Sequence, residues 1–281
     1  MDSKQLSKQF MLSSIEKVKR LNRSRPEPSP ISKVFTYLVI DRSGSMSRFG
    51  SSTMDATEKF LKEQKDLENK FSVPHYISVR SFDDKAKEYI KNNASRVKTV
   101  SKNEIYDICY PRGTTRLYDT ILETLIDLNQ KAREWFETQT KEMKTLIPID
   151  KIPRTLIVFT DGEDNQSKID PDGIKMKKEL IQFRKNGGTA IFMGTDQDAI
   201  EKGQQYGFHK NQCLTIDSNS DSIDNAFDGI FTMVRGISSG KSNVIPPLVR
   251  LSSSVKYNQH SYSSQMRGFS LDQDSQPPLL F

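Results

Sequence analysis

Residues 37–46, Tyr-Leu-Val-Ile-Asp-Arg-Ser-Gly-Ser-Met, decide how this chain folds. An apolar run ends abruptly at Asp41, and Ser43 and Ser45 follow at spacings of two. The pattern predicts a buried strand that ends in a turn carrying one carboxylate and two hydroxyls. Hard oxygen atoms gathered at one point suit Mg²⁺ or Mn²⁺ better than zinc or copper. For this motif alone, an ordinary turn leading into a helix cap is an equal alternative.

Two later segments change that balance. Residues 112–119, Arg-Gly-Thr-Thr-Arg-Leu-Tyr-Asp, place two threonines on a glycine turn before a helical run. Residues 155–163, Thr-Leu-Ile-Val-Phe-Thr-Asp-Gly-Glu, form a second apolar strand that ends on an aspartate. Neighbouring parallel strands bring their carboxyl ends to one crevice, where open α/β sheets bind ligands. We therefore expect a single site formed by Asp41, Ser43, Ser45, one of the two threonines and Asp161.

Strand and helix patterns alternate along the middle of the chain. The expected strands cover residues 34–40, 76–82, 86–90, 155–160, 189–194 and 213–216, and the expected helices cover about 53–70, 117–143, 173–185, 198–206 and 222–237. The Asp-Asp-Lys turn at 83–85 indicates a hairpin, so the strands on either side of it pair antiparallel. The alternation predicts an α/β fold: a Rossmann-like open sheet, mostly parallel with one antiparallel edge strand, and helices on both faces.

The two ends of the chain differ from its middle. Residues 1–30 combine a basic stretch, in which apolar residues recur at helical spacing, with a Pro-rich linker. Such an arm can touch an acidic surface, pack on its own domain or stay unfolded. Residues 241–281 are rich in Ser, Gln and Pro, which indicates a flexible tail. We therefore expect one domain at residues 31–240 between a basic amphipathic arm and a tail.

Charge and cysteine content limit the classes of function. The net charge of +6 belongs to the ends, because residues 1–25 hold seven basic and two acidic side chains and residues 241–281 hold four basic and two acidic ones. A nucleic-acid-binding fold carries its positive charge on the folded surface, so we expect no nucleic-acid partner. No apolar run is long enough to span a membrane, and no secretory signal is recognisable. Cys109 and Cys213 lie far apart without metal-ligand spacing, which favours an intracellular, cytoplasmic or particle-associated protein.

The three motifs together resemble the metal-ion-dependent adhesion site (MIDAS) of von Willebrand factor type A domains, the family that includes integrin inserted domains. Residues 41–45 match its first motif, and residues 160–163 match its last. Gly-Thr-Thr-Arg-Leu-Tyr-Asp at 113–119 is similar to the family's threonine turn and selects Thr115 over Thr114. The resemblance spans about residues 33–238. The continuation at 193–199, Met-Gly-Thr-Asp-Gln-Asp-Ala, is similar to a bacterial and phage subgroup of the family.

This resemblance implies a particular set of metal ligands. Hydroxyls of Ser43, Ser45 and Thr115 would bind Mg²⁺ or Mn²⁺, and the carboxylates of Asp41 and Asp161 would act directly or through water. A cation held mostly by neutral ligands keeps much of its charge and seeks an acidic side chain from outside. The resemblance therefore implies a metal-dependent module that binds a protein partner through that partner's Glu or Asp, and not an enzyme.

Two other classes of function stay open at this point. The chain can be a structural or scaffold component of an assembly, held through its ends; its associations would then be indifferent to a chelator. A phosphatase with Asp41 as nucleophile is less favoured, because the second carboxylate that such enzymes carry two residues on is here Ser43. No phosphate-binding glycine loop and no hydrolase triad is recognisable, and we expect His75, His209 and His260 at the surface. The partner's identity and the oligomeric state stay open.

Overall fold

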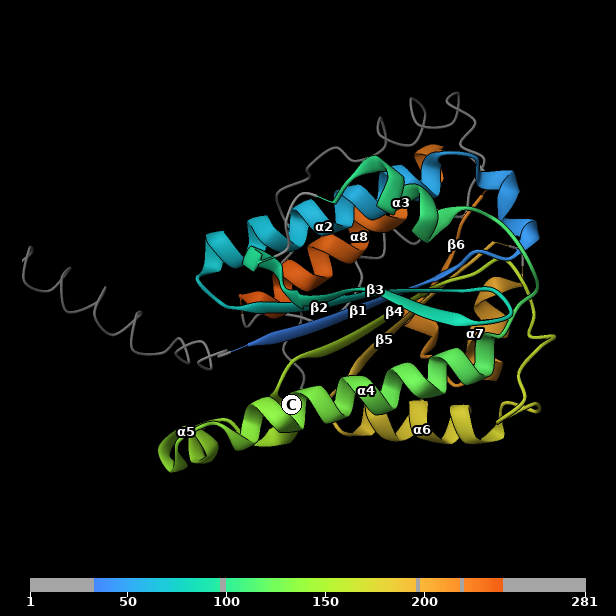
Figure 1. The fold of residues 1–281 in the computed structure, drawn as a ribbon. Helices are drawn as coiled ribbons and strands as arrows, with labels where there is room; N and C mark the ends of the chain where they lie inside the picture. Colours follow the sequence, from blue (N-terminus) through green and yellow to red (C-terminus); the bar gives the residue numbers. More distant parts are fainter. Residues whose placement is uncertain (1–32, 97–99, 196–197, 218–219, 240–281) are drawn as a thin grey trace, which may run out of the picture.

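The computed structural model describes residues 33–96, 100–195, 198–217 and 220–239 (Figure 1). The basic arm, the C-terminal tail with His260, and part of the continuation at 193–199 lie outside the described residues, so the expected boundaries at 31 and 240 stay predictions. The strands are β1 (Val34–Asp41), β2 (His75–Phe82), β3 (Ala86–Asn93), β4 (Arg154–Phe159), β5 (Thr189–Gly194) and β6 (Cys213–Thr215).

These strands form one sheet in the order β3-β2-β1-β4-β5-β6. Every neighbouring pair is parallel except β2 and β3, which are joined by the hairpin turn at residues 83–85. The sequence prediction of a mostly parallel α/β sheet with one antiparallel edge strand is therefore confirmed. The central strand β1 is buried at every position because helices cover both of its faces.

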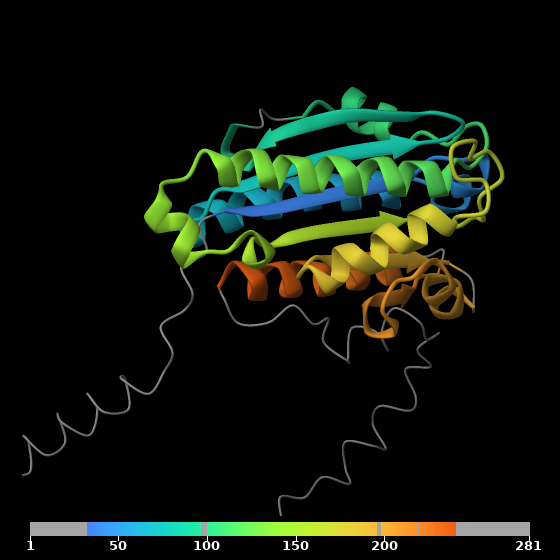
Figure 2. The ribbon, with the colours of Figure 1, turned by 90° about the horizontal axis from the view of Figure 1, so that it is seen from below.

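Helices cover the sheet in two layers (Figures 1 and 2). One layer contains α2 (Ser52–Phe71), α3 (Lys102–Cys109) and α8 (Ser220–Ser238), and the other contains α4 (Leu117–Glu137), α6 (Ile174–Lys185) and α7 (Ala199–Tyr206). Alternate residues of a strand point to opposite faces. Leu38 and Ile40 of β1 accordingly join the first layer, and Tyr37 and Val39 join the second.

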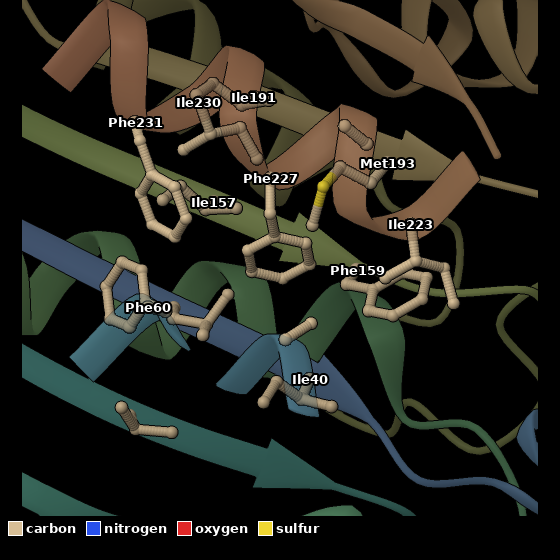
Figure 3. Close-up of a cluster of buried hydrophobic side chains, with 14 of the residues drawn as sticks. Ile40, Phe60, Ile157, Phe159, Ile191, Met193, Ile223, Phe227, Ile230 and Phe231 are labelled. Atoms are coloured by element: carbon tan, nitrogen blue, oxygen red, sulfur yellow. The ribbon is translucent and has the colours of Figure 1, made fainter. Parts of the chain in front are cut away.

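The first layer contains a dense aromatic and aliphatic cluster (Figure 3). Phe227 of α8 lies between Phe159 of β4 and Phe231, with ring centroids 6.4 Å and 6.1 Å away. Phe231 in turn stacks at 6.4 Å on Phe60 of α2. Burial of such side chains stabilises the fold by about 1.5–3 kcal/mol each. The cluster ties α2 and α8 to the strands whose ends carry the motif residues.

Two helical segments differ from the sequence prediction. The helix expected to continue to about residue 143 ends at Glu137, and α5 (Lys141–Leu146) follows as a separate helix. Thr138 Oγ1 and Gln139 Nε2 donate to the carbonyl of Trp135, which ends the first helix, and Thr140 caps the second. The other difference is α3, which the sequence prediction missed.

The missed helix α3 begins at a capping box. Ser101 Oγ accepts from the backbone N–H of Glu104, and the Glu104 carboxylate accepts from the backbone N–H of Ser101. This reciprocal pattern is a recognisable signal for a helix start, so the sequence did carry the information.

Among the described residues, no helix has the length and apolar character that crossing a membrane requires.

Candidate functional site

The predicted motif residues come together beyond the carboxyl ends of β1 and β4. These strands pair in parallel, with Ile40 opposite Phe159, so that Asp41 and Thr160 leave the sheet at the same edge. The loop from Arg112 to Arg116 lies against the first motif, because Gly44 N–H donates to the carbonyl of Gly113 at 3.2 Å. Three loops that are distant in sequence thus form one end of the molecule, at the upper right of Figure 1.

The carboxylate of Asp41 is fully buried and held at both oxygens. Its Oδ1 accepts from the backbone N–H of Ser43 at 2.7 Å, and its Oδ2 accepts from the hydroxyl of Thr160 at 2.6 Å. Burial raises the pKa of Asp41 to about 6, and the negative charge of Asp161 adds to the shift, while the hydrogen bonds from Thr160 and Ser43 oppose it. The site therefore holds a carboxylate whose charge the protein only partly stabilises.

The two serines connect the first motif to the last one. Ser43 Oγ and Ser45 Oγ share a hydrogen bond of 3.1 Å, and Ser45 Oγ donates to Asp161 Oδ1 at 2.7 Å. Ser43 is buried, whereas Ser45 is exposed at the surface. Four of the five predicted residues are thus linked by short polar contacts or by the turn itself.

The fifth predicted residue, Thr115, lies on the same side of the site. Its backbone is fixed by Asn165, whose side-chain Oδ1 accepts from Thr115 N at 2.9 Å and whose N–H donates to Thr115 O at 3.0 Å. A Cβ placed on Gly162 would lie 3.4 Å from Thr115 Oγ1 and 3.9 Å from Asp41 Oδ2. The space beside Gly162 is therefore lined by both groups. Thr115 is buried and Thr114 is exposed.

This donor set fits a hard divalent cation. It offers three neutral hydroxyls and two carboxylates, all oxygen ligands of the kind that Mg²⁺ and Mn²⁺ prefer. In the part of the chain that the structure describes, no three His, Cys, Asp or Glu side chains gather as a cluster. A cation at this edge would consequently depend on the hydroxyls of Ser43, Ser45 and Thr115 as well as on the two carboxylates.

Sequence reasoning missed Arg48, whose positively charged side chain lies at this site. Arg48 lies on the 3-10 helix η1 (Gly44–Phe49), directly after the serines, and its Nε is 3.1 Å from Asp161 Oδ2. Its Nη2 donates to the backbone carbonyl of Asp161 at 3.4 Å and to the hydroxyl of Thr195. No periodicity links residues 113 positions apart, so the sequence carried no signal for this contact.

A second missed feature is a buried ion pair behind the motif loops. Arg42, the residue between Asp41 and Ser43, places Nε 2.9 Å from Asp83 Oδ2, and both side chains are buried. Arg42 Nη1 also donates to Tyr89 Oη at 2.6 Å, and Arg112 Nε lies 3.0 Å from the same Asp83 oxygen. Burial alone would raise the pKa of Asp83, but hydrogen bonds, one of them from Arg112, and the charge of Arg42 hold it below its usual value.

Asp83 therefore joins the first motif, the threonine turn and the hairpin. Its backbone carbonyl accepts from Arg116 N at 2.9 Å, and the carbonyl of Arg42 accepts from Arg112 N at 2.6 Å. Gly113 has φ +70°, and a Cβ there would lie 3.2 Å from Asp83 Cβ. The threonine turn thus needs glycine at this point both for its left-handed backbone and for close approach to Asp83.

Asp119 anchors the loop that follows β4. It is fully buried, and its two oxygens accept backbone N–H groups of Lys168, Ile169 and Asp170 at 2.8–3.1 Å. Arg116 Nη2 lies 3.1 Å from its Oδ2. Burial alone would raise the pKa of Asp119, but these backbone hydrogen bonds and the charge of Arg116 lower it. The residue ended the quoted threonine-turn motif, but its role as an anchor was not predicted.

The surface position expected for His75 is wrong. His75 opens β2 and is fully buried beneath α2 and α8. Its Nδ1 lies 3.0 Å from Gln64 Oε1, and its Nε2 lies 3.1 Å from Ser238 Oγ. The preceding Pro74 suggested a strand entry open to solvent, but two helices that are distant in sequence close over it. His209 is exposed as expected.

The sequence profile of the von Willebrand factor type A domain matches residues 37–229. The chain belongs to this family. Members of the von Willebrand factor type A family are generally binding modules and not enzymes. No curated protein matches the chain.

Several solved structures are similar to this von Willebrand factor type A chain. A von Willebrand factor type A structure from Catenulispora acidiphila is 15% identical, with 73% of this chain and 43% of that one covered and a TM-score of 0.49. The pilus adhesin SpaC of Lactobacillus rhamnosus GG is 13% identical, with 73% and 30% covered and a TM-score of 0.48. Proximal thread matrix protein 1 from the mussel byssus, with a zinc-occupied MIDAS motif, is 17% identical, with 73% and 46% covered and a TM-score of 0.47.

This chain spans less than half of the length of each of these structures. The family assignment rests on the sequence match, which covers the strands and loops that carry all five predicted residues.

Proposed function

We propose that this chain is a Mg²⁺- or Mn²⁺-dependent protein-binding module. Asp41, Ser43, Ser45, Thr115 and Asp161 would hold the cation, which would offer an open coordination position to a Glu or Asp of a partner protein. One observation supports this most directly: the serine hydroxyls, the Asp161 carboxylate and the Asp41 carboxylate converge from separate loops on one small volume.

The protein would contribute two things besides the ligands. The parallel pairing of β1 and β4 brings the loops that carry Asp41 and Asp161 to the same edge of the sheet, so the ligands would lie near one another before a cation arrives. The ion pair of Arg42 with Asp83 holds the backbone of the first motif against the threonine turn. When bound, the cation would supply the Lewis acidity that attracts a carboxylate oxygen.

We also propose that the module acts inside a cell or in a particle assembled there. Cys109 and Cys213 are free thiols, buried in the clusters on opposite faces of the sheet. Burial raises the pKa of each thiol to about 12, which keeps both protonated and unreactive. Such a pair neither needs nor forms a disulfide in the folded chain.

The first test is metal binding by calorimetry on the full chain. Asp41→Ala should weaken Mn²⁺ and Mg²⁺ binding by more than about 100-fold, since loss of an outer-shell partner alone costs about 10–100-fold. Asp224→Ala is the matched control, because the Asp224 side chain on α8 is 55% exposed and lies 3.9 Å from Lys59, away from the motif loops. Equal metal affinity in the wild type and Asp41→Ala would overturn the proposed ligand set.

The second test concerns the partner. Proteins captured from a lysate of the source with Mg²⁺ should be lost both in EDTA and with Asp41→Ala. The alternative is a scaffold held through its ends, for which the associations would persist in all three conditions. That result would move the binding elements from the metal site to the arm and the tail.

A further inference from the structure

Arg48 is built into the candidate metal site. The η1 helix that carries it is anchored by two buried side chains, Met46 and Phe49, and the Phe49 ring packs edge-on against Phe159 at 5.3 Å. The Arg48 guanidinium lies 5.5 Å from the centre of the Phe49 ring. The position of this cation is therefore set by the core and not only by its polar contacts.

The guanidinium faces the carboxylate of Asp161 and is also open to solvent. The Arg48 side chain is 40% exposed, whereas the Asp161 side chain is fully buried. Asp161 forms an ion pair with Arg48 at Oδ2 and accepts a hydrogen bond from the Ser45 hydroxyl at Oδ1. A ligand that reaches the exposed Ser45 would meet Arg48 beside it.

Arg48 changes the net charge of the candidate metal site. Two carboxylates and one divalent cation would form a neutral site, and Arg48 would make the same site +1. The other carboxylate of the last motif, exposed Glu163, lies 3.2 Å from Lys202, which also lies 3.4 Å from Asp198. A positive charge this close lowers the attraction for an incoming cation and raises the attraction for an incoming anion.

We propose that Arg48 determines the specificity of the site for acidic partners: it weakens metal binding and supplies a second contact, beside the metal, for the partner's carboxylate. This inference rests on the proposed function. A guanidinium suits the task because its planar array of donors matches a carboxylate, and because it stays charged at any physiological pH. The ligand class is thus a side-chain carboxylate of a protein, taken by two cationic groups at once.

The experiment uses the full chain and two probes, Mn²⁺ alone and then a hexaglutamate peptide with the Mn²⁺-loaded protein. Arg48→Gln should bind Mn²⁺ about 3- to 10-fold more tightly and hexaglutamate about 3- to 10-fold more weakly, as expected for removal of one partly screened charge. Arg235→Gln is the matched control, since Arg235 has a similar exposure of 48% and lies in the last turn of α8. A hexaglutamine peptide controls for contacts that do not involve carboxylates.

Arg48→Lys separates charge from shape. It should leave Mn²⁺ affinity near the wild-type value while reducing hexaglutamate affinity, because lysine keeps the charge and loses the planar donor array. If the wild type binds Mn²⁺ and Arg48→Gln has the same affinities for Mn²⁺ and hexaglutamate, the proposed role of Arg48 is overturned. The proposed function of the site would then still stand. Absence of Mn²⁺ binding in the wild type and all variants would overturn the proposed function and this inference with it.

Discussion

Asp41 and Asp119 are both fully buried carboxylates beside the same loops, yet the protein treats them in opposite ways. Asp119 receives three backbone N–H groups and the charge of Arg116, and its pKa is lowered. Asp41 accepts from a single backbone N–H, that of Ser43, and otherwise from hydroxyl groups, and burial raises its pKa to about 6. The protein itself stabilises the carboxylate of Asp119. The carboxylate of Asp41 would instead be stabilised by an added cation.

This difference separates a structural carboxylate from a candidate ligand. Asp41 begins the first motif and Asp119 ends the threonine-turn motif, and both side chains are fully buried. What distinguishes them is the number and kind of donors around each oxygen atom. Isosteric replacement by asparagine removes the charge with little change of shape, so the same substitution at both positions tests the comparison.

The largest effect is expected from Asp119→Asn. Both oxygens of Asp119 accept backbone N–H groups, so the new amide places its NH₂ against donors in either orientation. We expect the free energy of unfolding to fall by about 3–5 kcal/mol, the range for breaking a buried charged contact. Urea denaturation with far-UV circular dichroism measures this loss. A change below about 1 kcal/mol would show that the loop after β4 does not depend on this anchor.

A slightly smaller loss of folding stability is expected at acid pH, because His75 is buried. Burial lowers the pKa of His75 to about 4, with the charge of Glu68 opposing the shift, and its neighbours Gln64 and Ser238 are neutral. The unfolded state, with the ordinary pKa near 6.5, therefore binds a proton that the folded state does not. Stability is fully present above about pH 6.5 and falls towards pH 4, by up to about 3 kcal/mol.

His75→Gln should remove this part of the pH dependence. Urea denaturation of both proteins between pH 7 and pH 4 measures it, because the two proteins share every other residue. Parallel curves of stability against pH in the two proteins would contradict the prediction. A smaller pH dependence in His75→Gln would show that His75, like Asp41, is a buried ionisable group whose charged form the protein does not stabilise.

The smallest effect is expected from Asp41→Asn in metal-free protein. The amide oxygen can still accept from Ser43 N, and the hydroxyl of Thr160 can rotate to accept from the new NH₂, since Gly162 O lies 3.4 Å away as another acceptor. Lost hydrogen-bond strength is offset by removal of a buried charge, so we expect a change within about 1 kcal/mol. A loss comparable to that of Asp119→Asn would make Asp41 a structural residue and erase the contrast.

Much of the fold, and the gathering of the motif residues at one edge of the sheet, was readable from the sequence. The apolar runs ending at Asp41 and Asp161 predicted two strands and their shared edge, and the structure brings both residues together with Ser43 and Ser45. Helix α3 was also readable, since Ser101 and Glu104 carry a capping signal. The helix boundary at Glu137 was harder to read, because the residues that end it are polar but not strong helix breakers.

The sequence alone determined the layered sheet and the edge at which polar loops gather, because these follow from local alternation and from where apolar runs stop. Only the tertiary structure decided which charges face each other there. Arg48 and Asp161, like Arg42 and Asp83, meet across chain segments with no shared periodicity. His75 is buried for the same reason: Gln64 and Ser238 reach it only when helices from both halves of the chain pack on one face of the sheet.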